Sequence, residues 1–373
     1  MYKRSQSTID PLLTISLVSF LLLSMLIVSS VTIFIAERSY NDPFYFLSRH
    51  LIHMLLAGAS FLLGYLTKPS FWVRYRAMML VVAMLLLIVV FIPGIGSTIN
   101  GSRRWIRLPL MTIQTSDPAK LAFIIFTAAF AAQKFSSSIG FARKWLPILL
   151  LLAVFDGLLL MQPDFGSAIV TTGVTLQILF IAGMPILSFF MILTAASIQA
   201  ALLAVFSPYR LMRIVSFLDP WLFPYSSGYQ LTQSLMAIGR GGFWGVGLGS
   251  SLQKIFYLPE AHTDFIFAVF CEEIGAIGGI VVMIAFCAIV LRLITWSYYF
   301  YHREQYFNCF YFVGISGWIG FQFIVSSGVN MGLLPTKGIS MPLLSYGGTH
   351  MLTSLFAFGI VYRIIQENAK RES

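Results

Sequence analysis

The chain has 373 residues, of which 58% are hydrophobic and 10% are charged, and its formal net charge is +10. Because a soluble domain carries roughly 25% charged residues, this composition excludes a water-exposed globular surface and predicts an integral membrane protein. The three cysteines lie in or beside apolar runs, without the spacing of a metal site or of a disulfide framework.

Apolar runs long enough to span a bilayer follow one another along the chain, and a longer, more polar stretch separates the seventh from the eighth. The runs are Pro11–Ala36, Phe46–Leu66, Ala77–Pro93, Ala119–Ala132, Trp145–Met161, Gly166–Met184, Ile186–Phe206, Phe265–Trp296, Phe307–Leu333 and Tyr346–Ile365. Apolar spans of this length require helices, since only a helix satisfies its own backbone in lipid. We therefore predict an all-α integral membrane protein with about ten transmembrane helices, a single domain over residues 1–373 with a large extracytoplasmic loop at about 207–264.

An even number of spans places both termini on the same side of the membrane. Lys3 and Arg4 at the start, and Arg363, Lys370 and Arg371 at the end, predict that this side is cytoplasmic. Nearly half of the 24 Lys and Arg residues then fall on the outer side, and most of these lie in three connections. We interpret them as the lining of an outer cavity for an anionic substrate. General contact with lipid headgroups is the alternative.

Several carboxylates lie at membrane rims or within spans, where ionisable groups are costly and usually face a cavity or a partner. Asp264 stands apart, because it lies among aromatic and aliphatic residues where the long loop enters the eighth span. Burial would raise its pKa and a nearby cation would lower it, so the carboxylate could stay ionised and still accept a proton from a sugar hydroxyl. Helical spacing predicts Glu272 on the same face, deeper in the cavity. The alternative is a helix N-terminal residue favoured by the dipole.

Two connections are rich in small residues. The third connection contains Gly94–Ile106, in which the paired Arg103 and Arg104 suit a phosphate or carboxylate. The long loop contains Gly239–Gly249, whose glycine density predicts a tight, re-entrant or cavity-lining backbone. No Walker motif, zinc-site spacing or hydrolase nucleophile elbow is present in the sequence.

These segments together resemble the SEDS family (shape, elongation, division and sporulation) over nearly the whole chain. The matching stretches are Asn100–Trp105, Ala119–Ala122, Gln162–Gly166, Gly228–Ser234, Gly239–Gly249, Leu258–Phe267, Leu333–Gly338 and Ser345–Gly348, in the family's order and spacing. The forms of Arg103–Trp105 and Pro335–Gly338 are more similar to the division branch than to the elongation branch.

The resemblance implies a metal-assisted, inverting peptidoglycan glycosyltransferase that polymerises lipid II outside the membrane. The donor would be a polyprenyl-pyrophosphate-linked glycan, and the cofactor a divalent cation, Mg or Mn. The implied partners are a class B penicillin-binding protein and other divisome membrane proteins, with no nucleic acid. The implied location is the bacterial inner membrane at the division septum, with multiple spans and both termini cytoplasmic.

The family's essential aspartate falls on Asp264, which we predict to be the general base. The predicted substrate-binding residues are Arg103, Arg104, Lys120, Arg210, Gln230, Arg240, His262, Thr263, Lys337 and Ser345, and several of these cations would stabilise the leaving pyrophosphate. Asp264, Glu272 and Asp117 are the candidate metal ligands.

One segment departs from the family. Residues 114–118 read Gln-Thr-Ser-Asp-Pro, where relatives usually have a Gln-Pro-Ser-Glu-type segment. Asp117 keeps the charge on a shorter side chain, and we expect a remodelled helix start with the function retained. Three other functions stay open at this point: a lipid II flippase, a non-enzymatic divisome scaffold and an elongation-type polymerase.

Overall fold

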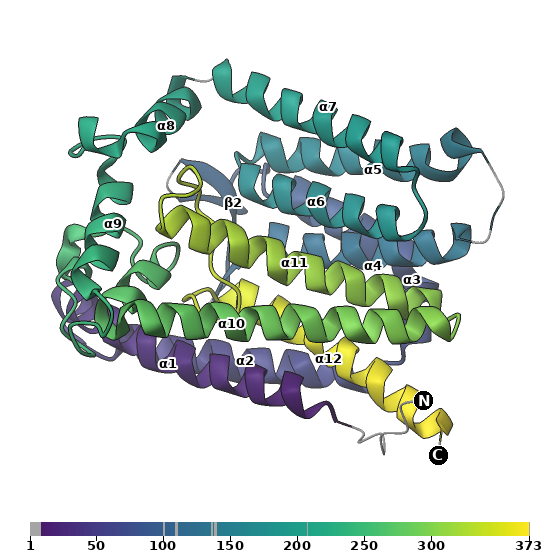
Figure 1. Ribbon diagram of the computed structural model, residues 1–373, viewed down its shortest axis with the longest axis horizontal. Helices are drawn as coiled ribbons and strands as arrows, with labels where there is room; N and C mark the ends of the chain where they lie inside the picture. Colours follow the sequence, from purple (N-terminus) through teal and green to yellow (C-terminus); the bar gives the residue numbers. More distant parts are fainter. Residues whose placement is uncertain are drawn as a thin grey trace.

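Long apolar segments form helices that lie side by side, as the computed structural model shows (Figure 1). The structure describes residues 9–99, 101–108, 111–135, 137, 140–206 and 208–372. Lys3, Arg4 and Asn100, which belong to segments named above, lie outside these ranges. The helices that overlap the predicted runs are α1 (Pro11–Tyr40), α2 (Tyr45–Leu66), α3 (Pro69–Val89), α4 (Ser116–Lys134), α5 (Phe141–Met161), α6 (Phe165–Ile181), α7 (Ile186–Val205), α10 (Ile266–His302), α11 (Tyr306–Asn330) and α12 (Gly348–Glu372).

The predicted all-α membrane fold is confirmed. Seven of the described helices (α1, α2, α3, α5, α10, α11 and α12) are long and apolar enough to cross a membrane, and α6 and α7 contain shorter apolar helices. The start of α1 and the end of α12 lie at one end of the bundle, which we call the termini end (Figure 1). The connections that precede α4 and α10 lie at the opposite end, the loop end.

The connection between α3 and α4 is not the plain loop that was expected from the sequence. It forms a small antiparallel sheet of β1 (Gly96–Ile99), β2 (Ser102–Arg107) and β3 (Thr112–Gln114), in the order β1-β2-β3. These strands are short and half-buried along most of their length. Their sequences, GSTI, SRRWIR and TIQ, are too short and too polar to show the alternation of apolar and polar residues by which a strand is recognised.

The long loop is also largely helical. It contains α8 (Pro208–Leu218), the 3₁₀ turn η1 (Pro220–Leu222), α9 (Tyr229–Gly241) and the π-helical turn η2 (Gln253–Tyr257). Figure 1 shows α8 and α9 at the loop end, away from the start of α1 and the end of α12. This arrangement brings α9 and η2 against the start of α10, where Asp264 lies.

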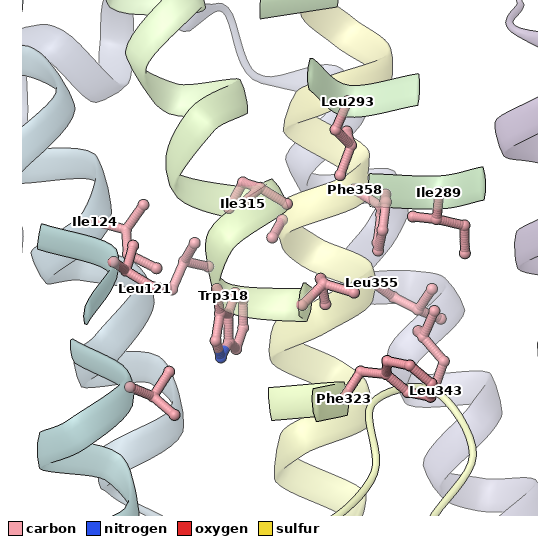
Figure 2. Close-up of a cluster of buried hydrophobic side chains, with 14 of the residues drawn as sticks. Leu121, Ile124, Ile289, Leu293, Ile315, Trp318, Phe323, Leu343, Leu355 and Phe358 are labelled. Carbon is pink, nitrogen blue, oxygen red and sulfur yellow. The ribbon is translucent and has the colours of Figure 1, made fainter. Parts of the chain in front are cut away.

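The core is centred on α11. Side chains of three other helices and of the segment before α12 surround Ile315, Trp318 and Phe323 of α11 (Figure 2). They are Leu121 and Ile124 of α4, Ile289 and Leu293 of α10, Leu355 and Phe358 of α12, and Leu343. The Trp318 side chain is fully buried. Since α11 is enclosed on all these sides, its end at Asn330 is a fixed point for the loops beside it.

α10 is broken near its start, at Gly275, where φ is 86° and ψ is 177°. The glycine-rich segment after α9 supplies the backbone hydrogen bonds that the break leaves open. The Val246 N–H donates to the Glu272 carbonyl over 3.0 Å, and the Ala276 N–H donates to the Gly242 carbonyl over 2.9 Å. A Cβ atom at Gly275 would overlap the backbone of this segment. The glycine-rich segment is therefore a series of turns that packs into the break in α10.

α2 and α12 cross in close contact through one glycine on each helix. A Cβ atom at Gly64 of α2 would overlap the Phe356 carbonyl oxygen, and one at Gly359 of α12 would overlap the Phe61 carbonyl oxygen. Small residues at such crossings let two backbones approach within packing distance in a membrane protein. This crossing fixes the segment that leads into α12 relative to α2.

We expect Gly359→Ala to destabilise the protein, because the added methyl group meets backbone atoms that cannot rotate away. Overpacking of this kind costs about 1–3 kcal/mol, which thermal unfolding of the purified protein in detergent will measure. Gly58→Ala in α2 is the matched control, since nothing lies within 4 Å of its Cβ position, and it should be neutral or slightly stabilising. Equal unfolding temperatures for the two variants would contradict the proposed crossing.

Candidate active site

Asp264 lies in the turn that precedes α10, and its side chain is half-buried. The end of α11 holds this turn in place. The Asn330 side chain donates to the Asp264 carbonyl oxygen over 2.9 Å and accepts a hydrogen bond from the Ala268 N–H over 3.0 Å. One buried amide thus fixes both the turn and the start of α10, which sets the position of the Asp264 carboxylate.

The segment between α11 and α12 closes over the same turn. The Ser345 hydroxyl donates to the Thr263 carbonyl over 2.6 Å and accepts from the Met341 N–H over 2.8 Å. The Tyr346 N–H donates to the His262 carbonyl over 3.0 Å. The structure therefore brings the predicted residues His262, Thr263 and Ser345 together with Asp264. The Ser345 side chain holds the turn by bonding to the turn's backbone.

The environment of Asp264 raises its proton affinity. Burial raises the pKa of Asp264 to about 7, Glu260 adds to the rise, and Arg104 and Arg213 oppose it. A Cβ atom at Gly338 would lie 2.9 Å from Asp264 Oδ2, so the backbone at Gly338 packs directly against the carboxylate. A group with this pKa is ionised in part at neutral pH and is well suited to accept a proton.

Arg213 of α8 is a residue of the site that the sequence did not single out. Its guanidinium donates to the Thr336 carbonyl over 3.1 Å, which places α8 beside the segment that carries Gly338. In the sequence, Arg213 is only one of the Lys and Arg residues that are predicted to lie on the outer side of the membrane. The side chain of Arg210, one turn earlier, lies outside the described part of the structure, so its role stays a prediction.

Asp264 differs from the other buried carboxylates in its contacts. Among the residues that the structure describes, four other buried carboxylates near the loop end each have a cation: Asp117 with Lys120 at 2.9 Å, Asp164 with Arg104 at 3.3 Å, Glu272 with Arg240 at 2.7 Å and Glu273 with Lys254 at 2.9 Å. Within the same described ranges, Asp264 forms no ion pair, and its carboxylate oxygens accept no hydrogen bond. Asp264 therefore differs from these four carboxylates in having no cation of the described structure bound to it.

A second polar layer lies beneath Asp264. A cavity of about 20 Å³, enough for roughly one water molecule, is lined by Gln114, Asp117, Lys120, Asp164, Ser167, Gln322, Gly338 and His350, among others. Gly338 belongs both to this lining and to the Asp264 contact. His350, which the sequence did not single out, places Nδ1 3.7 Å from Asp117 Oδ1. Lys120 is thus paired within this layer and almost completely buried.

The departure at residues 114–118 is accommodated by the start of α4. This helix begins at Ser116, so Pro118 falls in its first turn, where a backbone N–H has no intrahelical acceptor and its loss costs little. Asp117 also lies in this turn, at the positive end of the helix dipole. The segment therefore forms an ordinary helix start, and the retained function stays a prediction.

One prediction about Glu272 is corrected. Helical spacing predicts that Glu272 lies on the same face as Asp264. The helix α10 begins only at Ile266, however, so helical periodicity does not connect the two residues. The Glu272 carboxylate is fully buried and accepts hydrogen bonds from Arg240, Ser251 and the Leu252 N–H. Both of its oxygens are already engaged within the protein, and Arg240, which the sequence predicts to bind substrate, is one of their partners.

The remaining predicted residues take separate positions. Arg103 donates to the Ile92 carbonyl, just beyond the end of α3, over 2.9 Å. The Lys337 ammonium lies over the Phe165 ring, 4.9 Å from its centroid, in the segment that contains Gly338. Gln230 is half-buried on α9. Of the predicted cations whose side chains are described, Arg104 and Lys337 lie beside the Asp264 turn.

The family model described as cell cycle protein, which covers FtsW, RodA and SpoVE, matches residues 11–370. The chain belongs to this family. It is 42% identical over 359 residues to the probable peptidoglycan glycosyltransferase FtsW of Coxiella burnetii, covering 96% of each protein. It is 39% identical to the corresponding protein of Legionella pneumophila, covering 98% of this chain and 93% of the relative.

Solved structures of the family have the same fold. A chain of a peptidoglycan synthase complex, studied for its structural coordination of polymerization and crosslinking, superposes with a TM-score of 0.77 at 25% identity and covers 96% of this chain and 98% of its own length. The rod shape determining protein RodA of Thermus thermophilus gives a TM-score of 0.70 at 24% identity, with 96% and 97% covered. The predicted resemblance to the SEDS family is thereby confirmed.

We predict that the ion pair between Lys254 and Glu273 holds η2 against α10 and has no separate catalytic role. Both side chains are 2% exposed, and Ser30 of α1 donates to the same carboxylate. Lys254→Met leaves a buried carboxylate without its cation, which typically costs about 3–5 kcal/mol. Adding Glu273→Gln should recover most of the unfolding temperature. A single variant as stable as the wild type would contradict this role.

Proposed function

We propose that this chain is a peptidoglycan glycosyltransferase that polymerises lipid II at the loop end of the bundle, with Asp264 as the general base. The observation that carries the proposal is the environment of Asp264: a half-buried carboxylate without an ion pair among the described residues, whose pKa is raised to about 7. The relatives named as peptidoglycan glycosyltransferases support the same reaction.

The reaction needs one proton acceptor and a stabilised leaving group. Asp264 accepts the proton of the acceptor sugar's 4-hydroxyl, whose oxygen forms a bond to the donor's anomeric carbon. The bond from that carbon to the pyrophosphate oxygen breaks, and the configuration inverts. The pyrophosphate leaves as an anion, so no second carboxylic acid is needed to protonate it, in contrast to a glycosidase. Arg104, Arg213 and Lys337 provide positive charge beside the Asp264 turn.

A divalent cation, Mg or Mn, fits this site as a partner of the substrate. Among the described residues, no three His, Cys, Asp or Glu side chains gather in a group that could hold a metal ion. Mg²⁺ is commonly held by one or two carboxylates together with substrate phosphates, and Asp264 offers the carboxylate. The ion would neutralise charge that develops on the pyrophosphate.

The proposed setting is the division septum of the bacterial inner membrane. The family relatives carry the name of the division protein, and a chain of similar fold belongs to a peptidoglycan synthase complex. We infer that a class B penicillin-binding protein crosslinks the strands that this chain makes. A flippase or a scaffold would not depend on the proton affinity of Asp264, which separates these functions by experiment.

Asp264→Asn should abolish polymerisation, because the amide cannot accept the proton. The loss of a general base typically costs 10²–10⁴-fold in rate, which a gel assay of lipid II polymerisation by the purified protein with its penicillin-binding partner will detect. Asp264→Glu should also be severely impaired, since a displacement near 1 Å costs about 10²-fold. Glu37→Gln, at an exposed carboxylate at the end of α1, is the control. A rate for the Asp264→Asn variant within a few-fold of wild type would assign the base elsewhere.

The polymerisation rate should fall as the pH decreases through about 7, the raised pKa of Asp264. Only the ionised carboxylate acts as a base, so each pH unit below this value removes roughly tenfold in rate. Glu260→Gln removes a neighbouring negative charge that raises the pKa of Asp264, and the acid limb should then move to lower pH. A flat profile between mildly acidic and mildly basic pH would argue against Asp264 as the base.

The orientation is tested by cysteine labelling in a variant without Cys271, Cys287 and Cys309. Ser226 is exposed between η1 and α9 at the loop end, and a cysteine at this position should be labelled from outside in intact spheroplasts. A cysteine at the exposed Ser70, in the first turn of α3 at the termini end, should be labelled only after lysis. The reverse pattern would place the termini outside and exclude the proposed site of polymerisation.

A further inference from the structure

A second cavity lies at the termini end of the bundle, away from Asp264. Its volume is about 490 Å³, and it is formed where α3 begins, α11 begins and α12 ends. All of these are helix ends, so the cavity lies at the level where the bundle meets the membrane surface. Nothing in the proposed polymerisation reaction uses it.

The wall of the cavity is predominantly positive. Lys68, Lys370 and Arg371 line it, with Glu367 as the carboxylate. The Glu367 side chain accepts from Arg363 Nε over 2.9 Å, so its negative charge is compensated by a further cation. The wall therefore has an excess of positive charge, which favours an anionic ligand.

The polar floor of the cavity is preformed. Asn368 is 3% exposed, and its Nδ2 donates to the Tyr299 hydroxyl over 2.7 Å. Gln305 Nε2 donates to Asn368 Oδ1 over 3.4 Å, and Asn308 Nδ2 donates to Gln305 Oε1 over 2.7 Å. The cavity is thus shaped by a hydrogen-bonded network that joins α10, α11 and α12, and a ligand would not have to order these side chains.

The start of α11 adds to the positive field, since Gln305 makes no side-chain cap and the first-turn residues Phe307 and Asn308 line the cavity. The lining is also partly apolar. Val73, Phe307 and Ile364 lie beside the cations. A ligand that suits both parts has an anionic group next to an apolar body.

We propose that this cavity binds the phosphate and glycerol region of an anionic phospholipid at the membrane surface of the termini end. The cations contact the phosphate, and the apolar side chains contact the start of the acyl chains. A soluble phosphate shares the anionic group but would leave the apolar wall uncovered, and for this reason we assign the site to the lipid. The assignment does not depend on the proposed polymerase function.

The test uses the full-length protein in nanodiscs of phosphatidylcholine, with and without phosphatidylglycerol. Native mass spectrometry will count retained phosphatidylglycerol, and thermal unfolding will measure the stabilisation that it provides. Lys68→Glu and, separately, Arg371→Glu reverse cavity charges, and each should weaken retention about tenfold or more, since one charge-assisted contact corresponds to roughly that factor. Arg74→Glu, an exposed residue of α3 that does not line the cavity, carries the same charge change and should retain the lipid like wild type.

Each result decides the proposal. Unfolding in pure phosphatidylcholine should be the same for all variants, and this comparison separates a binding defect from a folding defect. Loss of retention in both cavity variants but not in Arg74→Glu would support the site. Equal retention in all proteins would overturn it. Stabilisation by inorganic phosphate in phosphatidylcholine nanodiscs, equal to that by phosphatidylglycerol, would assign the cavity to a soluble anion and overturn the lipid assignment.

Discussion

A charged side chain enclosed by apolar helices requires a partner of opposite sign, because the surrounding medium solvates it poorly. Ion pairs of this kind lie at both ends of the bundle. At the termini end, Asp10 caps α1 and pairs with Arg292 of α10 at 2.7 Å. At the loop end, Lys254 and Glu273 tie η2 to α10 and α1. These pairs fix the helices around the core of α11. Asp264, in contrast, forms no ion pair with the described residues.

The same constraint explains why a site for an anionic substrate needs so many cations. Several cations at the loop end already neutralise carboxylates of the protein, so the raw number of outer Lys and Arg residues overstates the charge available to a ligand. Arg104 contributes in two ways, since it pairs with Asp164 and also lowers the pKa of Asp264. The pKa of Asp264 reflects this balance, since burial and Glu260 raise it while Arg104 and Arg213 lower it.

The sequence was sufficient to predict the long helices, because apolar runs of spanning length have few alternative structures in lipid. It also marked Asp264, through its apolar neighbours and the family segment that contains it. It did not reveal the sheet after α3, since its strands have no alternating pattern. Glu272 was misplaced because the helix that would align it with Asp264 begins only at Ile266. The ion pair of Arg240 with Glu272 was not predicted, because pairing between distant segments is decided by the packing of α9 on α10, which no local pattern encodes. In the same way, the contact of Arg213 with the segment around Thr336 depends on the packing of α8 and could not be predicted from the sequence.

The break at Gly275 divides α10 into parts with different mechanical surroundings. The part after the break is a long rod held between α1 and α11. The part before it, which follows Asp264 directly, is a short piece whose backbone is bonded to the segment after α9 through Val246. The same short piece is also bonded to the end of α11, since the Ala268 N–H donates to Asn330 Oδ1 over 3.0 Å. The position of the carboxylate is thus set by α11 and by the segment after α9, and the long rod of α10 can take its own direction through the bundle.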